Sequence, residues 1–193
     1  MDIFFTYLTQ GGFISAIVLI WLSFYFVLTI WIYISRSLTM SSWESVEKAS
    51  LETLLMGTPR IKRQSILSKC VQSGESSSTA TLGVCKSVAE KKATAYLSVL
   101  SVISSTSPFI GLFGTVVSIL ETFSKLDGSS SASLTVIAPA ISEALVATAA
   151  GIFVAIPAYS AHVFLKRQAY ELLSLLDREI DLLKLATSRR LQS

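Results

Sequence analysis

Charged residues are scarce in this chain of 193 residues, and long apolar runs take their place. Only 15% of the residues are charged, against roughly 25% in soluble domains, and 51% are hydrophobic. No charged residue occurs in 3–35 or in 93–120, and a third run, 134–165, is interrupted only by Glu143 and His162. Each run exceeds the ~20 residues with which a helix crosses the hydrocarbon core. The sequence therefore predicts an all-α integral membrane protein with three transmembrane helices.

Residues that commonly build catalytic or metal sites are also few. The chain has one histidine and two cysteines, and Cys70 and Cys85 show neither a CxxC spacing nor a histidine cluster. Without a glycine-rich phosphate loop, or a nucleophile beside a base, we expect no enzyme, no metal site and no cofactor. Both cysteines are expected as reduced, unliganded thiols. The aromatic-interleaved basic patch of a nucleic-acid-binding protein is absent as well.

Lysine and arginine are distributed unevenly among the segments that connect the spans. The segment 36–92 carries nine of the sixteen, the tail 166–193 carries six, and the loop 121–133 carries one. Because short segments rich in Lys and Arg stay on the cytoplasmic side, this bias predicts an outer N-terminus and a cytoplasmic C-terminus. The first apolar run is longer than the core of a signal peptide, so we expect it to remain as an anchor.

These boundaries divide the chain into six consecutive parts. They are the N-terminus with the first span, a cytoplasmic helical insertion, the second span, an outer loop, the third span and a cytoplasmic C-terminal helix: 1–35, 36–92, 93–120, 121–133, 134–165 and 166–193. Within the insertion, a capping box at Ser41–Glu44 predicts a new helix that stops at Gly57. A second short helix is expected from Thr58-Pro59, and the polar stretch 72–83 is expected to connect it to the second span.

The tail continues the helical periodicity of the third span with polar residues on its other faces. The stretch DREID at 177–181 supplies most of the charge, and small or apolar positions recur at Ala169, Leu173, Leu176, Ile180, Leu183 and Thr187. We expect the second and third helices to be long and to extend into the cytoplasm, the third as an assembly or bundle element. A helix lying on the membrane surface is the alternative, which the balance of acidic and basic residues on its polar face disfavours.

The second and third spans each carry a face of small residues, unlike the bulky first span. On the second span these are Ser104, Ser107, Pro108, Gly111, Gly114, Thr115 and Ser118, and on the third Ala140, Ala144, Ala147, Gly151, Ala155 and Ala158. Such faces let helix backbones approach closely, because lipid gives helices no hydrophobic reason to associate. We expect these two helices to pack against other helices and the first to face lipid.

Three polar residues, Thr115, Thr148 and Glu143, lie where a purely structural membrane helix needs none. Each has an ordinary explanation: a membrane threonine commonly bonds a carbonyl of its own helix, and Glu143 lies near the start of its run. Together, beside small residues and without a basic neighbour in sequence, they favour a protein-lined or water-lined interior and a path for ions or protons. His162 is expected to pack at the inner end of its helix, and not to relay protons.

Two segments resemble the TolQ/ExbB/MotA family of motor proteins, which are driven by the proton motive force. They are SPFIGLFGTVVSILETF at 107–123 and IAPAISEALVATAAGIFVAIPA at 137–158. The elements GLFGTV, APxIxEALxATA and AIPA follow one another in the family's order, although Ala140 stands where glycine is usual. The three-span topology resembles the TolQ/ExbB branch, because proteins of the MotA branch have four spans. Within the TolQ/ExbB branch, the chain is most similar to TolQ.

The resemblance implies a homopentamer in the bacterial inner membrane, with a periplasmic N-terminus and a central pore lined by the second and third helices. Two single-span helices of a TolR/ExbD-like partner would occupy the pore, and a membrane aspartate on the partner would take up and release protons. By motif position, Thr115 and Thr148 would face that aspartate, and Glu143 would be the family's glutamate. The residues that would pack on the pore face are Gly111, Gly114, Pro108, Ala144, Ala147 and Gly151.

The function that this resemblance implies is a proton-channel-forming stator subunit of a Tol-Pal-like motor that acts on a TolA/TonB-like protein. An ExbB-like subunit that energises TonB-dependent outer-membrane uptake is the alternative within the family, because both share every motif above. A non-conducting membrane scaffold is the alternative outside the family. It explains the small faces but leaves Glu143 and the two threonines without a purpose.

Overall fold

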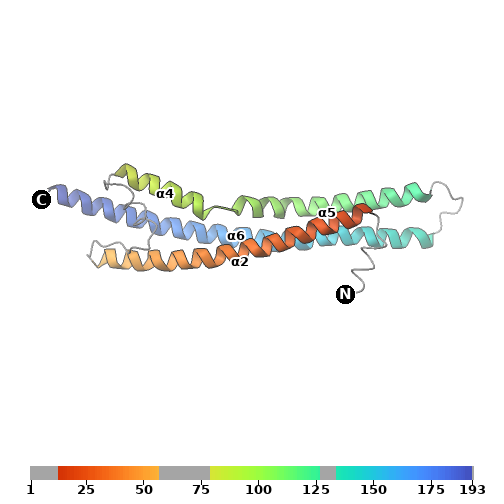
Figure 1. The fold of residues 1–193 in the computed structure, drawn as a ribbon, viewed down its shortest axis with the longest axis horizontal. Helices are drawn as coiled ribbons and strands as arrows, with labels where there is room; N and C mark the ends of the chain where they lie inside the picture. The colour runs from red at the N-terminus through yellow and green to blue at the C-terminus, as the bar shows by residue number, and fades with distance from the viewer. Residues whose placement is uncertain (1–12, 57–78, 127–133, 193) are drawn as a thin grey trace. The chain divides into compact units, whose positions relative to one another are not determined.

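The computed structural model describes residues 13–56, 79–126 and 134–192. Apart from short turns these residues are helical, and the helices are α2 (Phe13–Leu55), α4 (Thr79–Ala93), α5 (Leu97–Leu126) and α6 (Leu134–Gln192) (Figure 1). Among these described residues, three stretches are long and apolar enough to span a membrane: Ser15–Thr53, Leu82–Ser124 and Ile137–Leu185. The predictions of an all-α chain and of three such stretches are confirmed. The helix expected at Thr58-Pro59 lies outside the described residues.

Helix α2 is continuous through the position where the capping box predicts a new start. The hydroxyl of Ser42 donates to the carbonyl oxygen of Thr39 at 2.8 Å, within the same helix. The capping-box prediction is wrong because the amides that a cap would satisfy are already bonded inside a continuing helix. The helix ends at Leu55, just before the stop predicted at Gly57.

Helix α6 runs without a break from the third span into the tail, as the continued periodicity predicts. Helix α4 begins at Thr79, so the end of the connector predicted at 72–83 is helical instead. The buried side chain of Leu82, which packs in a cluster with Leu176 of α6, explains this difference. Packing of an apolar face stabilises a short helix whose intrinsic propensity is too weak to do so alone.

A turn separates α4 from α5, so the second span does not extend into the insertion as one continuous helix. Tyr96 in this turn has a φ of 69°, a left-handed conformation that ends a helix. The guanidinium of Arg36 donates to the carbonyl oxygens of Lys92 at 2.6 Å and Ala93 at 3.1 Å, and lies 5.9 Å from the centre of the Tyr96 ring. Arg36 thereby caps carbonyl groups at the end of α4, and its charge suits that end of the helix dipole.

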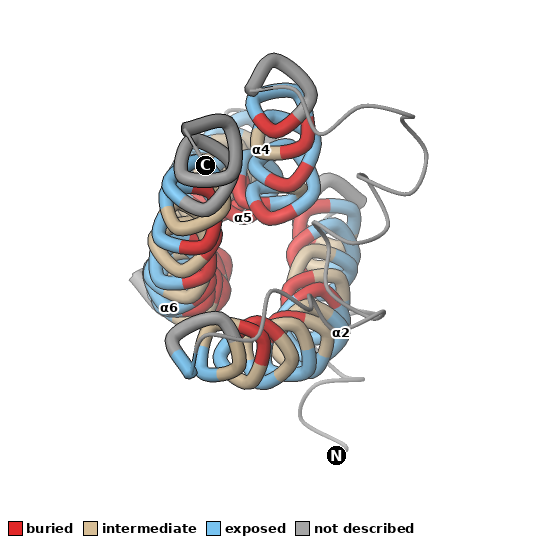
Figure 2. The backbone as a smooth tube through the Cα atoms, turned by 90° about the vertical axis from the view of Figure 1, so that its left-hand side faces the viewer, coloured by how far each residue is buried: buried red, intermediate tan, exposed pale blue. Residues whose placement is uncertain are grey.

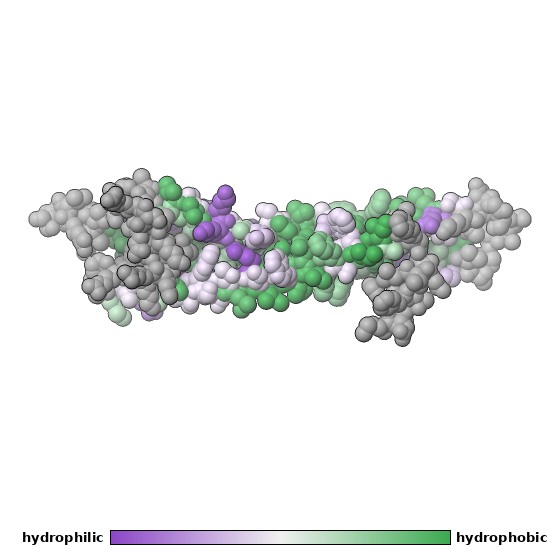
Figure 3. All heavy atoms as spheres, viewed as in Figure 1, coloured by the Kyte–Doolittle hydropathy of each residue, from purple (hydrophilic) through white to green (hydrophobic). Residues whose placement is uncertain are grey.

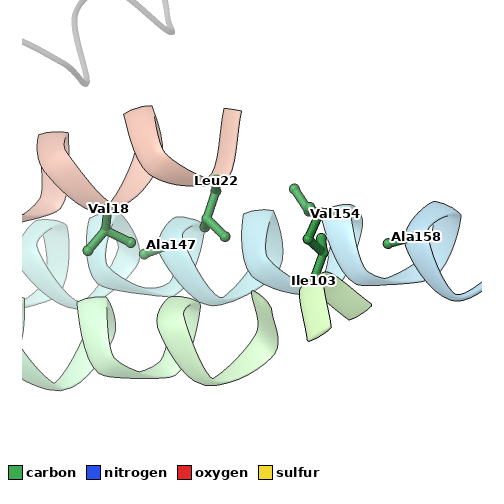
Figure 4. Close-up of a cluster of buried hydrophobic side chains, with 6 residues drawn as sticks. All are labelled: Val18, Leu22, Ile103, Ala147, Val154 and Ala158. Atoms are coloured by element: carbon green, nitrogen blue, oxygen red, sulfur yellow. The ribbon is translucent and has the colours of Figure 1, made fainter. Parts of the chain in front are cut away.

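The described residues fall into two compact units. Unit 1 contains those of Met1–Ile32 and Val99–His162, and unit 2 contains those of Tyr33–Ser98 and Val163–Ser193. In unit 1, Figure 4 shows Val18 and Leu22 of α2 pointing toward α6, and the buried cluster comprises Val18, Leu22, Ile103, Ala147, Val154 and Ala158. Large apolar side chains are exposed on the outer faces of unit 1, where hydrophobic atoms cover much of the visible surface (Figure 3). Such faces suit contact with lipid or with other membrane helices.

The backbones of α5 and α6 come into close contact at two glycines. A Cβ atom on Gly111 would lie 2.6 Å from the carbonyl oxygen of Ala147 and 3.2 Å from the Cα of Gly151. A Cβ atom on Gly151 would lie 2.6 Å from the carbonyl oxygen of Ser107. Both distances are shorter than non-bonded contact permits, so only glycine fits at this contact. The prediction that the small faces of these two helices pack closely is confirmed within one chain.

Unit 2 buries the inward faces of α2, α4 and α6 (Figure 2). Its apolar clusters are Leu82, Cys85, Ala89, Leu176 and Ile180, and Met40, Ala93, Ala169 and Leu172. Cys85 is disulfide-bonded, so the expectation of a reduced thiol there is wrong. That expectation rested on the redox state of the compartment, which says nothing about how closely the fold brings two thiols together. The other cysteine, Cys70, lies outside the described residues.

The tail of α6 confirms the predicted register at Ala169, Leu176 and Ile180, which are buried, while Leu183 is only partly buried and the side chain of Thr187 lies outside the described ones. Leu172 is buried, whereas the predicted Leu173 is only partly buried at the edge of the core. In the DREID stretch, the side chains of Asp177 and Asp181 are 48% and 72% exposed, as a solvated face requires. Glu179 is 0% exposed, so one of the charged residues of this stretch lies in the core.

Replacing Gly111 with alanine should force α5 and α6 apart, because the added methyl group meets backbone atoms of α6. Overpacking of this kind costs about 1–3 kcal/mol, so we expect a lower unfolding temperature of the purified protein in detergent. Gly83→Ala on α4 is the matched control, since its Cβ would meet nothing within 4 Å and alanine favours a helix by about 0.5–1 kcal/mol. Equal stability of the two variants would contradict the close contact.

Candidate functional site

The hydroxyl of Thr115 joins α5 to α6. The residue is 8% exposed, and its Oγ1 lies 3.2 Å from the carbonyl oxygen of Gly111, one turn earlier in α5. The same atom lies 2.9 Å from the carbonyl oxygen of Ala144 and 2.5 Å from the Oγ1 of Thr148, both in α6. A bond to its own helix, the ordinary explanation for a membrane threonine, therefore accounts only for the longest of the three contacts.

Either hydroxyl could be the donor between Thr115 and Thr148, and the other partners of Thr115 favour one direction. The carbonyl oxygens of Gly111 and Ala144 only accept, so the single hydroxyl proton of Thr115 goes to a carbonyl, of which Ala144 is nearer. The contact between the two hydroxyls then requires Thr148 to donate to the Thr115 oxygen. This arrangement leaves the acceptor sites of the Thr148 oxygen for a further donor.

The hydroxyl pair has one closed side and one more open side. Thr115 is buried, whereas Thr148 is half-buried. Both groups are uncharged, and the sequence from 99 to 162 contains Lys125 as its only lysine or arginine. A neutral donor or acceptor that approached Thr148 would thus meet a hydroxyl already held in place from behind by Ala144 and Thr115. This geometry suits a neutral group that donates or accepts a hydrogen bond.

Glu143 lies on the same helix but does not point with the threonine. Five residues separate it from Thr148, which turns the two side chains about 140° apart around α6. Glu143 is half-buried and directly precedes Ala144, whose carbonyl oxygen accepts the Thr115 proton. The structure therefore brings together the two predicted threonines and directs the predicted glutamate elsewhere.

The predicted packing residues all lie in unit 1, and most fall on the contacts between its helices. Ala144 and Ala147 are 0% and 2% exposed, and Gly111 and Gly151 meet across α5 and α6. The other two are Gly114, where a Cβ would lie 3.0 Å from Val18 of α2, and Pro108, which is half-buried. Their position on the face of a pore stays a prediction.

Sequence reasoning missed two backbone groups that shape the site. The carbonyl oxygen of Ala144 accepts the Thr115 proton, and the carbonyl oxygen of Ser107 lies against Gly151. The signal in the sequence is the repeat of Ser107, Gly111 and Thr115 at intervals of four, which puts all three on one face of a helix. Every residue has a backbone oxygen, so the pattern of side chains does not reveal which one accepts a hydrogen bond. The contact of Thr115 with the Ala144 carbonyl oxygen is therefore seen only in the structure.

Residues 61–178 match the model of the MotA/TolQ/ExbB proton channel family, a range that includes both threonines. The chain belongs to this family. A Helicobacter pylori protein, whose name describes it as an ExbB-like biopolymer transport protein, is 41% identical over 185 residues, or 95% of this chain and 97% of the relative. The predicted family is confirmed, and it is a family of proton channels and transport energisers, not of enzymes.

Shorter matches carry the names of both branches. A Tol-Pal system protein TolQ from Haemophilus influenzae is 52% identical over 52 residues, which is 27% of this chain and 23% of the relative. A biopolymer transport protein ExbB from Pseudomonas putida is 52% identical over 53 residues, which is 28% of this chain and 16% of the relative. Membership in the MotA/TolQ/ExbB family is therefore clear. The percentage of identical residues does not separate its TolQ and ExbB branches.

The Thr115–Thr148 hydrogen bond should contribute only modestly to stability. In a double-mutant cycle of Thr115→Val and Thr148→Val, we expect a coupling of about 0.6 kcal/mol and no more than about 1.7 kcal/mol, the range found between membrane helices. The measurement is unfolding of each variant in mixed detergent. Thr29→Val is the control partner, because Thr29 donates to Tyr25 in its own helix and should show no coupling with Thr148. Zero coupling between Thr115 and Thr148 would mean that the two hydroxyls do not meet.

Proposed function

We propose that this protein is the proton-channel-forming stator subunit of a motor that uses the proton motive force. The observation that carries the proposal is the hydroxyl pair of Thr115 and Thr148, held at the contact of two apolar helices. Each hydroxyl both donates and accepts, as a group that handles a passing proton must. Membership in a family of proton channels supports the same function. No covalent chemistry is required of the chain.

The hydroxyl pair suits both protonation states of a carboxyl group on a partner helix. While Thr115 donates to Ala144, the Thr148 oxygen accepts a hydrogen bond from a protonated carboxyl or from water. When the carboxyl is ionised, rotation of the Thr148 hydroxyl turns its proton toward the carboxylate, and Thr115 keeps its bond to Ala144. The exchange reorients one O–H bond and moves no backbone atom. Thr115 is thus a positioning residue, and Thr148 is the residue that would touch the acid.

The cost of burying a charge makes the favoured position of the partner's acid depend on whether the acid is protonated. An ionised carboxylate at the centre of a bilayer costs about 2.5–3.5 kcal/mol on the lenient insertion scale. A neutral acid tolerates the apolar wall, whereas an ionised one favours a position lined by hydroxyls or water. Alternating proton uptake and release would then bias the position of the partner helices relative to the channel subunits.

For the assembly, we propose a homopentamer in the bacterial inner membrane with a periplasmic N-terminus and a cytoplasmic C-terminus. Helices α5 and α6 of each copy would surround two single-span helices of a TolR/ExbD-like partner that carries a membrane aspartate. The small faces of α5 and α6, the exposed apolar faces of unit 1 and the distribution of Lys and Arg support this arrangement. Glu143 is proposed as a further polar group of the proton path.

For the cellular process, we propose a Tol-Pal-like role, with a TolA/TonB-like protein receiving the motion. A second candidate is an ExbB-like subunit that energises TonB-dependent uptake, and one observation favours it: the relative that matches over 97% of its length is named ExbB-like. A non-conducting scaffold gives no purpose to two hydroxyls bonded across a helix contact.

Thr148→Val tests the proton role, because valine preserves the shape of the side chain and removes its hydroxyl. In liposomes that contain the chain and its single-span partner, we expect proton flux to fall at least about tenfold, which corresponds to about 1.4 kcal/mol at the barrier. Assembly should be unchanged, and Thr148→Ser should retain flux because it keeps the hydroxyl. Thr29→Val is the control, since it removes a buried hydroxyl of α2 that bonds only within its own helix.

Full flux through Thr148→Val would rule out a role for the hydroxyl in proton transfer. Absence of flux through the unmodified chain with a bound partner would instead support the scaffold. Loss of flux in Thr29→Val as well would mean that removing any buried hydroxyl disrupts the channel.

Copurification separates the two branches. The tagged chain, expressed with a TolR-like and an ExbD-like single-span protein from the same genome, should retain the TolR-like protein if it energises a Tol-Pal-like complex. Native mass measurement of the purified complex should give five copies of this chain and two of the partner. Retention of the ExbD-like protein alone would establish the ExbB-like role.

A further inference from the structure

Unit 2 contains a polar cluster that the proposed function does not use. Glu47 of α2 and Glu179 of α6 are 1% and 0% exposed, and Ser50, one turn after Glu47, is 0% exposed. Glu47 and Ser50 lie seven and ten residues after the buried Met40, and Glu179 lies three residues after the buried Leu176. These intervals match the repeat of a helix face that packs in a bundle. Two carboxyl groups therefore occupy core positions, beyond the apolar runs 3–35 and 134–165 from which the spans are predicted.

The carboxyl group of Glu179 faces another acid. Both of its oxygens and the hydroxyl of Ser50 are buried without a hydrogen bond of standard geometry in the described structure, and the charge that acts on Glu179 is that of Glu47. Two ionised carboxylates held together out of water repel each other and lose their hydration. One shared proton removes a negative charge and creates an O–H donor between the two groups.

The ion pairs that the structure describes around this site involve other acids. Charged side chains of the three helices packed here pair with one another at the surface: Lys48 with Glu44 on α2, Lys86 of α4 with Asp177 of α6, and, on α6, Arg167 with Glu171 and Lys184 with Asp181. Glu90 of α4 and Arg178 of α6 are exposed. Among the residues whose side chains the structure describes, no salt bridge reaches Glu179.

We propose that Glu47 and Glu179 form a proton-binding site in which two carboxyl groups share one proton at neutral pH, and that release of this proton loosens α2 from α6 in unit 2. The site would make the packing of unit 2 sensitive to pH. This inference rests on the buried acids alone and not on the proposed channel function.

The pKa of Glu179 supports the assignment. Burial, followed by the negative charge of Glu47, raises it from 4.5 to about 8, and the nearby Ser50 hydroxyl offsets part of the rise. The folded chain thus holds a proton that the unfolded chain releases between these two pH values. The bound proton stabilises the fold fully below about pH 4.5, and this stabilisation is lost as the pH rises through about 8. Between these values, the ratio of folded to unfolded protein falls by up to about tenfold per pH unit.

A proton fits this site better than a metal ion. The residues that the structure describes contain no group of three or more His, Cys, Asp and Glu side chains that could hold a metal. Calcium takes about six to eight oxygen ligands and magnesium needs a near-octahedral set. Two carboxyl groups and the Ser50 hydroxyl supply too few, and buried neighbours such as Leu172 and Leu176 supply none.

The test uses the full chain in detergent and follows its unfolding midpoint and its infrared carboxyl absorption between about pH 6 and pH 9. For the unmodified protein, we expect the midpoint to fall with rising pH and the absorption of a protonated carboxyl to disappear over the same range. Glu179→Gln keeps the shape of the neutral acid but cannot ionise. It should flatten the pH dependence and remove the titrating absorption, and Glu47→Gln should shift the titration to lower pH.

Asp181→Asn is the matched control, since it removes an exposed carboxyl from the same turn of α6 and should leave both signals unchanged. A protonated carboxyl that persists unaltered in Glu179→Gln would overturn the proposal. So would stabilisation of the unmodified chain by calcium at about pH 6 without any titrating carboxyl, which would indicate a cation site. If Glu179→Gln does not fold, the titration in Glu47→Gln still decides, because an unshifted midpoint there means that the two acids do not interact.

Discussion

The contact between α5 and α6 at Gly111 and Gly151 is the constraint on which the candidate site depends. A Cβ atom at either glycine would clash with backbone atoms of the other helix. Only at this short separation does the Thr115 hydroxyl, one turn from Gly111, reach the carbonyl oxygen of Ala144 and the hydroxyl of Thr148. Lipid supplies no hydrophobic force to hold the helices there, so packing of small residues and the cross-helix hydrogen bonds hold them together.

Unit 2 is held together mainly by the burial of large apolar side chains. Its helices bury large side chains such as Leu172 and Leu176, which is how helices associate in water. Its buried polar residues include the acids Glu47 and Glu179, whereas unit 1 has threonines at its helix contact. Helix α6 takes part in both kinds of packing without a break, so it changes along its length from small-residue contacts with α5 to leucine contacts in unit 2.

Much of this could be predicted from the sequence, because hydrophobic length and small-residue spacing are local properties. The three apolar runs, the unbroken tail of α6 and both threonines follow from such patterns. The buried Glu179 could not be predicted, since an acid within DREID has the same local pattern whether water or Glu47 faces it. The disulfide bond of Cys85 and the continuation of α2 through Ser42 likewise depend on contacts between distant residues, which periodicity does not encode.

The two polar sets suit different relations to a proton. A threonine hydroxyl stays neutral at physiological pH, so its burial between α5 and α6 does not require burying a charge. Rotation about its C–O bond is enough to direct its proton to another acceptor. A buried carboxyl is costly when ionised and therefore retains a proton until the solution is alkaline. Hydroxyls at a helix contact thus favour the passage of protons, whereas paired acids in a leucine core favour the retention of one. If both assignments hold, the chain uses protons for movement in unit 1 and for pH-dependent packing in unit 2.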